Sequence, residues 1–317
     1  MSSGGRGGDG RSAERALASQ QAIEAGGIPL EAQARLDEVR RRGGAFFTSD
    51  LTTNEFLLLR RAGFRPVTQV MGSCFYNTGW QWLPQGSSGF GGGWGATYAE
   101  GQTLELETQT EAWNEARRRA LSRLAEEARR AGAHAVVGVR LERGAYDWAA
   151  GLIEFTAVGT AVVSDRYELG EEPVLSNLTG QQFVALLEHG YWPIGLVAAS
   201  TVAYVMTGWQ QQRGLRGGFL AGWSQNQELT DFTRGVYETR TQTMGQVSRQ
   251  AHELHAHGVV GVELHAEHHE HERDVNSVHY TDLILTMHVL GTAIVELAGA
   301  SEPPPVYIAL PLSEEHR

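Results

Sequence analysis

The chain has 317 residues, of which 41% are hydrophobic and 20% are charged, and its formal net charge is -11. This length and composition are typical of a globular protein of about two domains. The excess of acidic residues argues against a nucleic-acid-binding face, which needs clustered Lys and Arg. Cys74 is the only cysteine, so the chain can form neither an intrachain disulfide nor a Cys-rich zinc site. These features are typical of a reducing compartment, and we expect a cytoplasmic protein.

The N-terminal residues 1–45 are predicted to comprise a disordered arm and a short helix. The arm, to about residue 28, is rich in Gly, Ser and Ala and has few large apolar side chains with which to form a core. It also lacks the basic and then apolar pattern of a secretory signal. The spacing of apolar residues predicts a helix over 30–42 that ends at Gly43.

Two segments far apart in the chain share the same helix-start and helix-stop residues. Thr52 and Glu55 have the spacing of a capping box, and Gly63 stands where a left-handed helix terminus is expected. The same three roles recur at Thr179, Gln182 and Gly190. The recurrence of the same helix-start and helix-stop residues predicts an internal repeat.

Each copy continues with a strand, a long helix and two further strands. The paired segments are 64–79 and 194–207, 106–130 and 231–255, 133–142 and 256–265, and 152–163 and 280–295. The third pair reads AHAVVGVRLE and AHGVVGVELH, and a Gly inside each strand pattern indicates a bulge or a close backbone approach. Residues 191–208 are apolar and nearly long enough to span a membrane, but their counterpart is polar, so we interpret them as a buried strand.

The VVGV element, the GTAV at 159–162 and the GTAI at 291–294 resemble the YbjQ-like domain, a family named for heavy-metal binding. The resemblance implies small α+β modules of the strand, helix, strand, strand type, which assemble through sheet edges into ring-like, pentameric homo-oligomers. On this basis the fold class is α+β with two tandem modules, each with an added N-terminal helix. The predicted divisions are 46–165 for module 1, 166–175 for a linker, 176–298 for module 2 and 299–317 for an extended tail.

Histidines are concentrated in the second copy, where they indicate two candidate metal sites. The first comprises His265, His268, His269 and His271 around a predicted hairpin tip, with His279 arriving from the opposite strand. Imidazole and carboxylate donors suit Zn, Ni or Cu. The alternative is a solvated loop of mixed charge.

The second-choice site comprises His252, His255 and His257 at the end of a long helix. The first two lie on one helical face, but a helix C-terminus also favours imidazolium without any metal. His134 and His257 occupy equivalent turns, where a structural hydrogen bond is the favoured interpretation.

We therefore expect a non-enzymatic, oligomeric, cytoplasmic protein that binds a divalent transition metal, with no nucleic-acid or membrane partner. The sequence shows neither a catalytic triad nor a nucleotide-binding loop, so no catalytic or cofactor-binding residue is predicted. The alternative function is a metal-independent scaffold that presents the Gly- and Trp-rich loops 85–98 and 211–223 to a protein partner.

Overall fold

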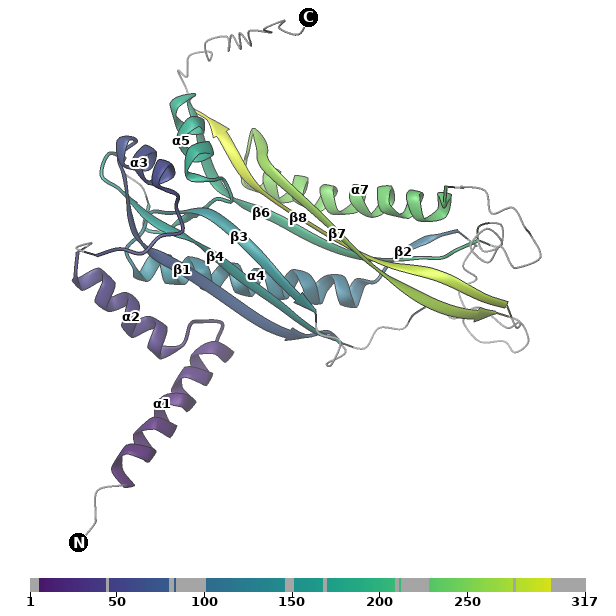
Figure 1. The fold of residues 1–317 in the computed structure, drawn as a ribbon, viewed down its shortest axis with the longest axis horizontal. Helices are drawn as coiled ribbons and strands as arrows, with labels where there is room; N and C mark the ends of the chain where they lie inside the picture. Colours follow the sequence, from purple (N-terminus) through teal and green to yellow (C-terminus); the bar gives the residue numbers. More distant parts are fainter. Residues whose placement is uncertain are drawn as a thin grey trace, which may run out of the picture.

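The computed structural model describes residues 6–43, 46–79, 83, 101–145, 151–167, 170–208, 211, 228–275 and 278–297. Over these residues the fold is mixed α+β, with six helices and two four-stranded sheets (Figure 1). The helices are α1 (Arg6–Glu24), α2 (Leu30–Arg41), α3 (Thr53–Arg61), α4 (Glu107–Arg130), α5 (Gly180–Glu188) and α7 (Thr230–Glu253). The strands are β1 (Phe64–Asn77), β2 (Thr103–Glu105), β3 (Ala135–Ala145), β4 (Leu152–Ser164), β5 (Val174–Leu175), β6 (Tyr191–Val205), β7 (Gly258–Val275) and β8 (Val278–Glu296).

The two sheets have related strand orders, β1-β4-β3-β5 and β2-β6-β8-β7. The short strand β2 precedes α4, yet it pairs antiparallel with β6 of the second sheet. The short strand β5 leads into the second half of the chain, yet it pairs parallel with β3 of the first sheet. Each half of the chain therefore contributes a strand to the other half's sheet.

Strand irregularities recur at corresponding places in the two sheets. The pairing of β1 with β4 shifts register after Pro66, and that of β6 with β8 shifts after Pro193. In β3 and β7 the shift falls at Gly138 and Gly261, whose φ angles are 67° and 61°. The bulges that the strand glycines indicated are thus present, since these left-handed angles suit glycine. The tandem-module division and the ring assembly stay predictions.

Both predicted capping boxes are present. The Thr52 side chain accepts from the Glu55 main-chain nitrogen while the Glu55 carboxylate accepts from the Thr52 nitrogen, at the start of α3. Thr179 and Gln182 make the same reciprocal pair at the start of α5. The helices are followed by glycines at positive φ, 88° for Gly63 and 79° for Gly190.

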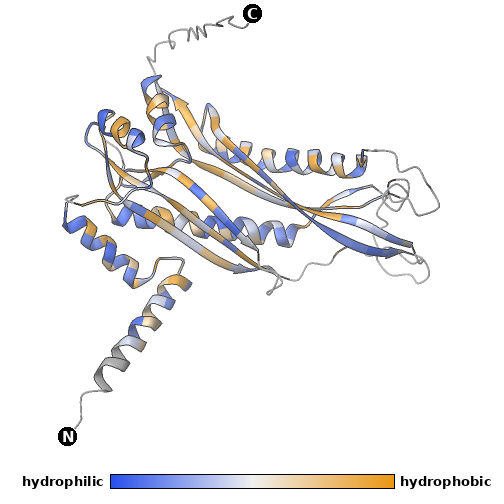
Figure 2. Ribbon diagram, viewed as in Figure 1, coloured by the Kyte–Doolittle hydropathy of each residue, from blue (hydrophilic) through white to orange (hydrophobic). Residues whose placement is uncertain are grey.

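Helix α4 packs on one face of the first sheet, and α7 packs on one face of the second (Figure 1). Trp113 and Leu124 of α4 are buried against Cys74 and Phe155 of the first sheet. Helix α4 also contacts β6, so the core continues from the first sheet into the second. Figure 2 shows this apolar interior in orange, and the shared end of β7 and β8 in blue.

Residues 6–24 form α1, where the sequence indicated a disordered arm. The second half of this segment is rich in Ala, Glu, Arg and Gln, which have high intrinsic helix propensity. Its end is held to α2, because the Ser19 hydroxyl donates to the Glu31 carboxylate over 2.9 Å and the buried Ile28 packs near Leu36. These contacts between α1 and α2 could not be predicted from the composition of the segment.

The apolar segment 191–208 contains strand β6, which lies between β2 and β8, in agreement with the buried strand that the repeat indicated. Over the described residues, no helix is both long enough and apolar enough to cross a membrane. The Gly- and Trp-rich loops, apart from Gln211, and the tail beyond residue 297 lie outside the described residues.

Candidate functional site

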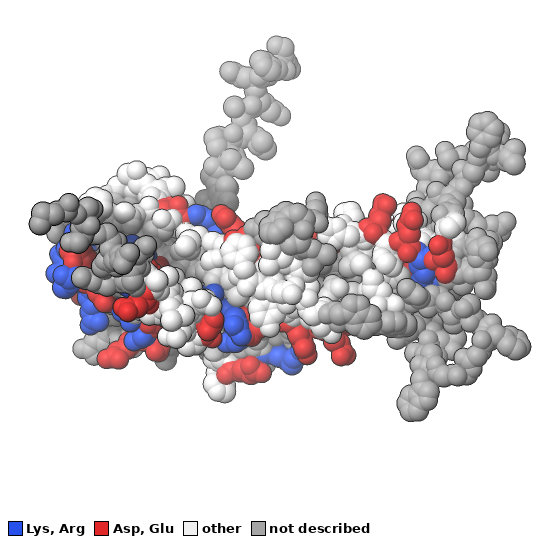
Figure 3. Space-filling view, turned by 90° about the horizontal axis from the view of Figure 1, so that it is seen from below, with Lys and Arg blue, Asp and Glu red and all other residues white. Residues whose placement is uncertain are grey.

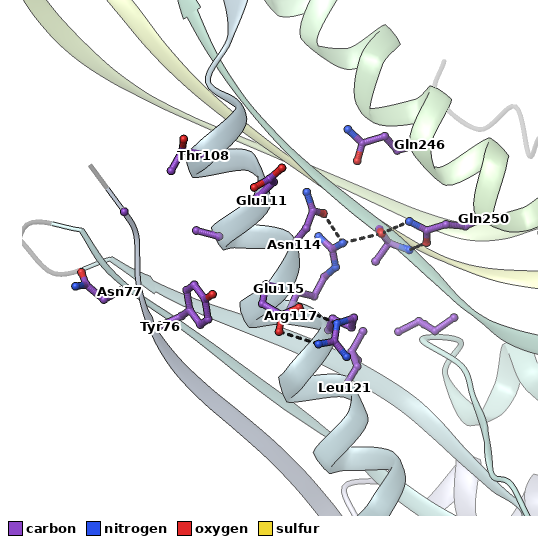
Figure 4. A pocket seen from close by; sticks show the side chains of 15 residues that line it. Tyr76, Asn77, Thr108, Glu111, Asn114, Glu115, Arg117, Leu121, Gln246 and Gln250 are labelled. Carbon is purple, nitrogen blue, oxygen red and sulfur yellow. Dashed lines mark hydrogen bonds and ion pairs between the residues drawn. The ribbon is translucent and has the colours of Figure 1, made fainter. Parts of the chain in front are cut away.

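A cleft of about 1020 Å³ lies between α4 and α7, with β6 at its floor (Figure 4). Its lining combines apolar surface with polar side chains, among them Asn77 of β1, Asn114 and Glu115 of α4, and Gln246 and Gln250 of α7. In Figure 4 the Asn114 and Arg117 side chains lie together and are linked towards β6, while Gln250 approaches from the other side. The cleft therefore marks where two helices meet one strand.

Three polar side chains of α4 satisfy the edge of β6. Thr110 Oγ1 accepts from the Val202 nitrogen over 2.9 Å. Asn114 accepts from the Ser200 nitrogen through Oδ1 over 3.0 Å and donates to the Ser200 oxygen through Nδ2 over 2.8 Å. Arg117 donates to the Ala198 oxygen over 2.8 Å. These three residues, which we call the α4 polar row, cover a strand edge that would otherwise expose unpaired main-chain groups.

Arg117 is a buried cation whose hydrogen-bond partners are neutral. It is 7% exposed and donates to Ser200 Oγ over 2.6 Å as well as to Asn114 and Ala198. Desolvation lowers the pKa of Arg117 to about 10, which still leaves the guanidinium charged at neutral pH. The residue thus carries a positive charge into the contact between α4 and the second sheet.

His288 continues this chain of polar groups. Its Nδ1 lies 2.8 Å from Ser200 Oγ, and its ring lies 4.8 Å from Trp113 and 5.9 Å from Phe155, centroid to centroid. Burial, followed by the charges of Arg143 and Arg117, holds the pKa of His288 well below its ordinary value. The imidazole is therefore neutral at pH 7.

A second buried polar cluster lies towards the other end of β8. Arg273 and Tyr204 both donate to the Asp282 carboxylate, Arg273 Nε over 2.5 Å and Tyr204 Oη over 2.5 Å, and the Thr207 nitrogen donates to it over 2.8 Å. Asp282 has no exposed surface. Burial and the hydrogen bond to Asp282 raise the pKa of Tyr204, so the phenol stays protonated.

The predicted hairpin tip around His265–His271 is wrong, because these residues belong to the regular strand β7. His265 pairs with His288 and not with His279, which pairs with Asp274 and contacts its carboxylate. Strand alternation places His265, His269 and His271 on one face and His268 and His279 on the other. His265 and His279 lie about 30 Å apart along the ladder, nine residues at about 3.3 Å each.

The three histidines of the second-choice site have different local interactions. His252 bonds the Ser248 oxygen through Nδ1 over 2.6 Å, and His255 adopts a positive φ of 57° just after the helix. His257 Nδ1 accepts from the Glu296 nitrogen over 3.0 Å, as His134 Nδ1 does from the Ser164 nitrogen. His134 and His257, which occupy equivalent turns, therefore each accept a hydrogen bond from a main-chain nitrogen, as expected for a structural role.

No three His, Cys, Asp or Glu side chains among the described residues are grouped so that they could hold a metal ion. Among the described residues, the histidines that the sequence indicated are therefore not brought together at one place. The site that the structure does build, centred on Arg117 and His288, was not singled out from the sequence. One signal was available, since Arg117 lies on the apolar stripe of α4 between Trp113 and Leu121.

Comparison with known proteins agrees with the resemblance seen in the motifs. The family model YbjQ_1, described as "Putative heavy-metal-binding", matches residues 99–165. No solved structure matches the chain. The "Encapsulin nanocompartment protein Rv1762c" of Mycobacterium tuberculosis is 35% identical over 225 residues, which cover 68% of this chain and 76% of that protein. The chain therefore contains a YbjQ_1 domain and belongs to the same family as this encapsulin nanocompartment protein.

Proposed function

We propose that this protein is a non-enzymatic assembly protein of an encapsulin-type nanocompartment, which binds copies of itself and the shell protein. The observation that carries the proposal is the 35% identity, over most of both chains, to a protein named for such a compartment. The geometry supports protein binding, because the clearest constructed feature is a helix that covers a strand edge.

The second long helix repeats the geometry of the first but leaves its polar row exposed. The residues before α4 and α7, Leu106 and Leu229, have nearly the same backbone angles, with φ of -91° and -86° and ψ of 81° in both. Counting from these residues, Arg240 occupies in α7 the position of Arg117 in α4, and it is exposed. Tyr237 at the position of Asn114 is 66% exposed.

The first strand of the first sheet is the matching surface. Counting from Pro66 and Pro193, Met71 and Phe75 of β1 correspond to Ala198 and Val202 of β6. Ala198 and Val202 are buried beside α4, whereas Met71 is 51% and Phe75 is 58% exposed. A cavity of about 520 Å³ between β1 and the α1–α2 segment borders both side chains.

A second copy of the chain would therefore place its α7 against the exposed side chains of β1, since the main-chain groups at Met71 and Ser73 already bond Glu127 and Arg123 of α4. Such a head-to-tail contact is heterologous, so it closes into a ring if the rotation permits and otherwise extends. In such an assembly, the proposed modules 46–165 and 176–298 would alternate from one copy of the chain to the next. On the face seen in Figure 3, acidic and basic side chains lie beside one another in several places, with uncharged surface between them.

Light scattering coupled to size exclusion tests self-assembly. The wild-type chain should elute as a multimer, and Tyr237→Arg should elute as a monomer. Glu238→Arg, an exposed change next to it on α7, is the matched control and should stay multimeric. A wild-type monomer at tens of micromolar would contradict the head-to-tail contact.

Co-expression with the encapsulin shell protein of the same genome tests the shell partner separately. The chain should co-sediment with shells on a density gradient and be protected from added protease. Sedimentation apart from intact shells would refute this partner and leave self-assembly to be judged by light scattering.

A transition-metal function is the alternative that the family description favours. It is supported by the number of histidines on β7, but their division between the two faces of the strand opposes it. Equilibrium dialysis with Zn, Ni and Cu distinguishes the two functions.

A further inference from the structure

A small cavity of about 20 Å³ lies between the two sheets at the end of the Arg117–Ser200–His288 chain. Arg143 and Phe155 of the first sheet line one side of it, and Ser200 and His288 of the second sheet line the other. Arg117 of α4 completes the wall. This volume holds one occupant of about the size of a water molecule or a monatomic ion.

The hydrogen bonds around Ser200 bear on which nitrogen of His288 carries the proton. Ser200 Oγ has two side-chain partners, Arg117 Nη1 at 2.6 Å and His288 Nδ1 at 2.8 Å. Because a guanidinium can only donate, Ser200 Oγ accepts from Arg117, and its hydroxyl proton is free to go to His288 Nδ1. We assign this arrangement, in which Nδ1 accepts and the neutral ring carries its own proton on Nε2.

This Nε2–H is a buried donor without an acceptor. His288 is 6% exposed, and its Nε2 is shielded from solvent and has no hydrogen-bond partner among the described residues. Arg143 Nε is likewise a buried donor without a hydrogen-bond acceptor among the described residues. Glu267 Oε1 lies 3.4 Å from it and forms an ion pair, but without hydrogen-bond geometry. Both residues line the cavity, so an acceptor bound there is a candidate partner for the two donors.

Arg117 brings to the cavity a positive charge that has no acidic partner, whereas the Arg143 charge is paired with Glu267. Arg117 and Arg143 are both cations, and the buried hydrogen-bond partners of Arg117 are neutral. Glu263 also lines the cavity, but it is an exposed residue whose carboxylate accepts from Asn177 Nδ2 over 3.3 Å. His265, the remaining titratable group on the lining, is exposed as well. A buried cation with neutral partners favours an anion nearby.

We propose that this cavity binds one monatomic anion, chloride in the cell, held by His288 Nε2–H and Arg143 Nε–H beside the Arg117 charge. The ion joins the first sheet, the second sheet and α4 at one point. It therefore favours the folded arrangement of the two sheets and binds the unfolded chain no better than solvent does.

Bromide provides the direct test, because it replaces chloride and scatters anomalously. Crystals of the full chain grown in sodium bromide should show an anomalous peak between His288 and Arg143. A matched series of chloride, bromide and gluconate at constant ionic strength should raise the melting temperature by a few degrees for the two halides relative to gluconate. Gluconate is too large for the cavity and serves as the general salt control.

Arg143→Met should remove the peak and the halide-specific shift, whereas Arg249→Met, an exposed change on α7, should keep both. If Arg143→Met fails to fold, the wild-type crystal still decides the question. An ordered water at this point in crystals grown in bromide, or equal melting temperatures in the three salts, would overturn the proposal.

Discussion

Arg117 and Ser200 lie 83 residues apart in the chain and are joined by a hydrogen bond of 2.6 Å from Nη1 to Oγ. This bond connects a helix that packs on the first sheet with strand β6 of the second. The connection makes α4 a shared element, and the first prediction concerns its removal.

Arg117→Met should lower the free energy of unfolding by roughly 2–4 kcal/mol, because the Ser200 hydroxyl and the Ala198 carbonyl lose a charged donor in a buried place. Urea denaturation followed by tryptophan fluorescence measures the change. Arg240→Met, at the corresponding exposed position of α7, is the control and should leave the unfolding free energy of a dilute sample within about 0.5 kcal/mol of wild type. Equal losses in the two variants would contradict the role given to the α4 polar row.

The second prediction concerns the pH dependence that His288 imparts. Its pKa is lowered by burial in the folded chain, whereas in the unfolded chain it has the ordinary value of 6.5. The unfolded state therefore binds the proton more readily, and stability should be complete above pH 6.5 and fall as the pH drops below it.

His288→Gln should reduce the slope of stability against pH between about 6.5 and 5, where one such histidine contributes up to about 1.4 kcal/mol per pH unit. Urea midpoints at several pH values measure this slope. His189→Gln, an exposed change, should leave the slope as in wild type. An unchanged slope in His288→Gln would show that the buried imidazole does not titrate as inferred.

Loss of the Asp282 carboxylate should be more damaging than loss of any single neutral hydrogen bond. Asp282→Asn removes the negative charge that faces Arg273 in a buried place, and should cost about 3–5 kcal/mol. Thermal unfolding by circular dichroism measures it. Asp274→Asn, an exposed change on the same strand as Arg273, should have little effect, and comparable losses at the two positions would refute the buried ion pair.

The paired capping boxes allow a matched comparison. Thr52→Ala and Thr179→Ala should each cost about 1 kcal/mol, because each removes the side chain that caps a helix N-terminus. Thr53→Ala, one residue into α3, leaves the cap intact and should cost much less. Chemical denaturation gives the three values, and a loss at Thr53 equal to that at Thr52 would contradict the capping role.

Metal binding to the β7 histidines is the last prediction. We expect dialysed Zn, Ni and Cu to bind wild type no better than a variant in which His265, His268, His269 and His271 are Ala. The reason is that strand alternation sends His268 away from the other three. Binding that disappears in the variant would establish the site and contradict this geometric argument.

Sequence patterns predicted the local structure well because the signals were themselves local. Capping boxes, helix-ending glycines and strand glycines act over a few residues, and Thr52, Gly63 and Gly138 all have the conformations that their patterns indicated. The long helices and first strands were also placed within a few residues of their observed bounds.

The candidate site depends on contacts that the sequence does not reveal. A run of His and Glu is polar enough for a loop, yet β7 continues through it because β8 supplies a pairing partner along its whole length. Likewise, Arg117 and Asn114 resemble surface residues of a helix until β6, from the other half of the chain, lies beside them. Long-range strand placement decided both cases.

Because α4 packs against both sheets, the order in which the chain is synthesised affects how it folds. As the chain leaves the ribosome, Asn114 emerges 86 residues before Ser200, the group to which it bonds. Until β6 has been synthesised, the side chains of the α4 polar row therefore lack the β6 groups to which they bond in the folded chain. Chaperone contact should be longest in this interval, and the last step of folding should be the closing of β6 onto a helix that has already formed.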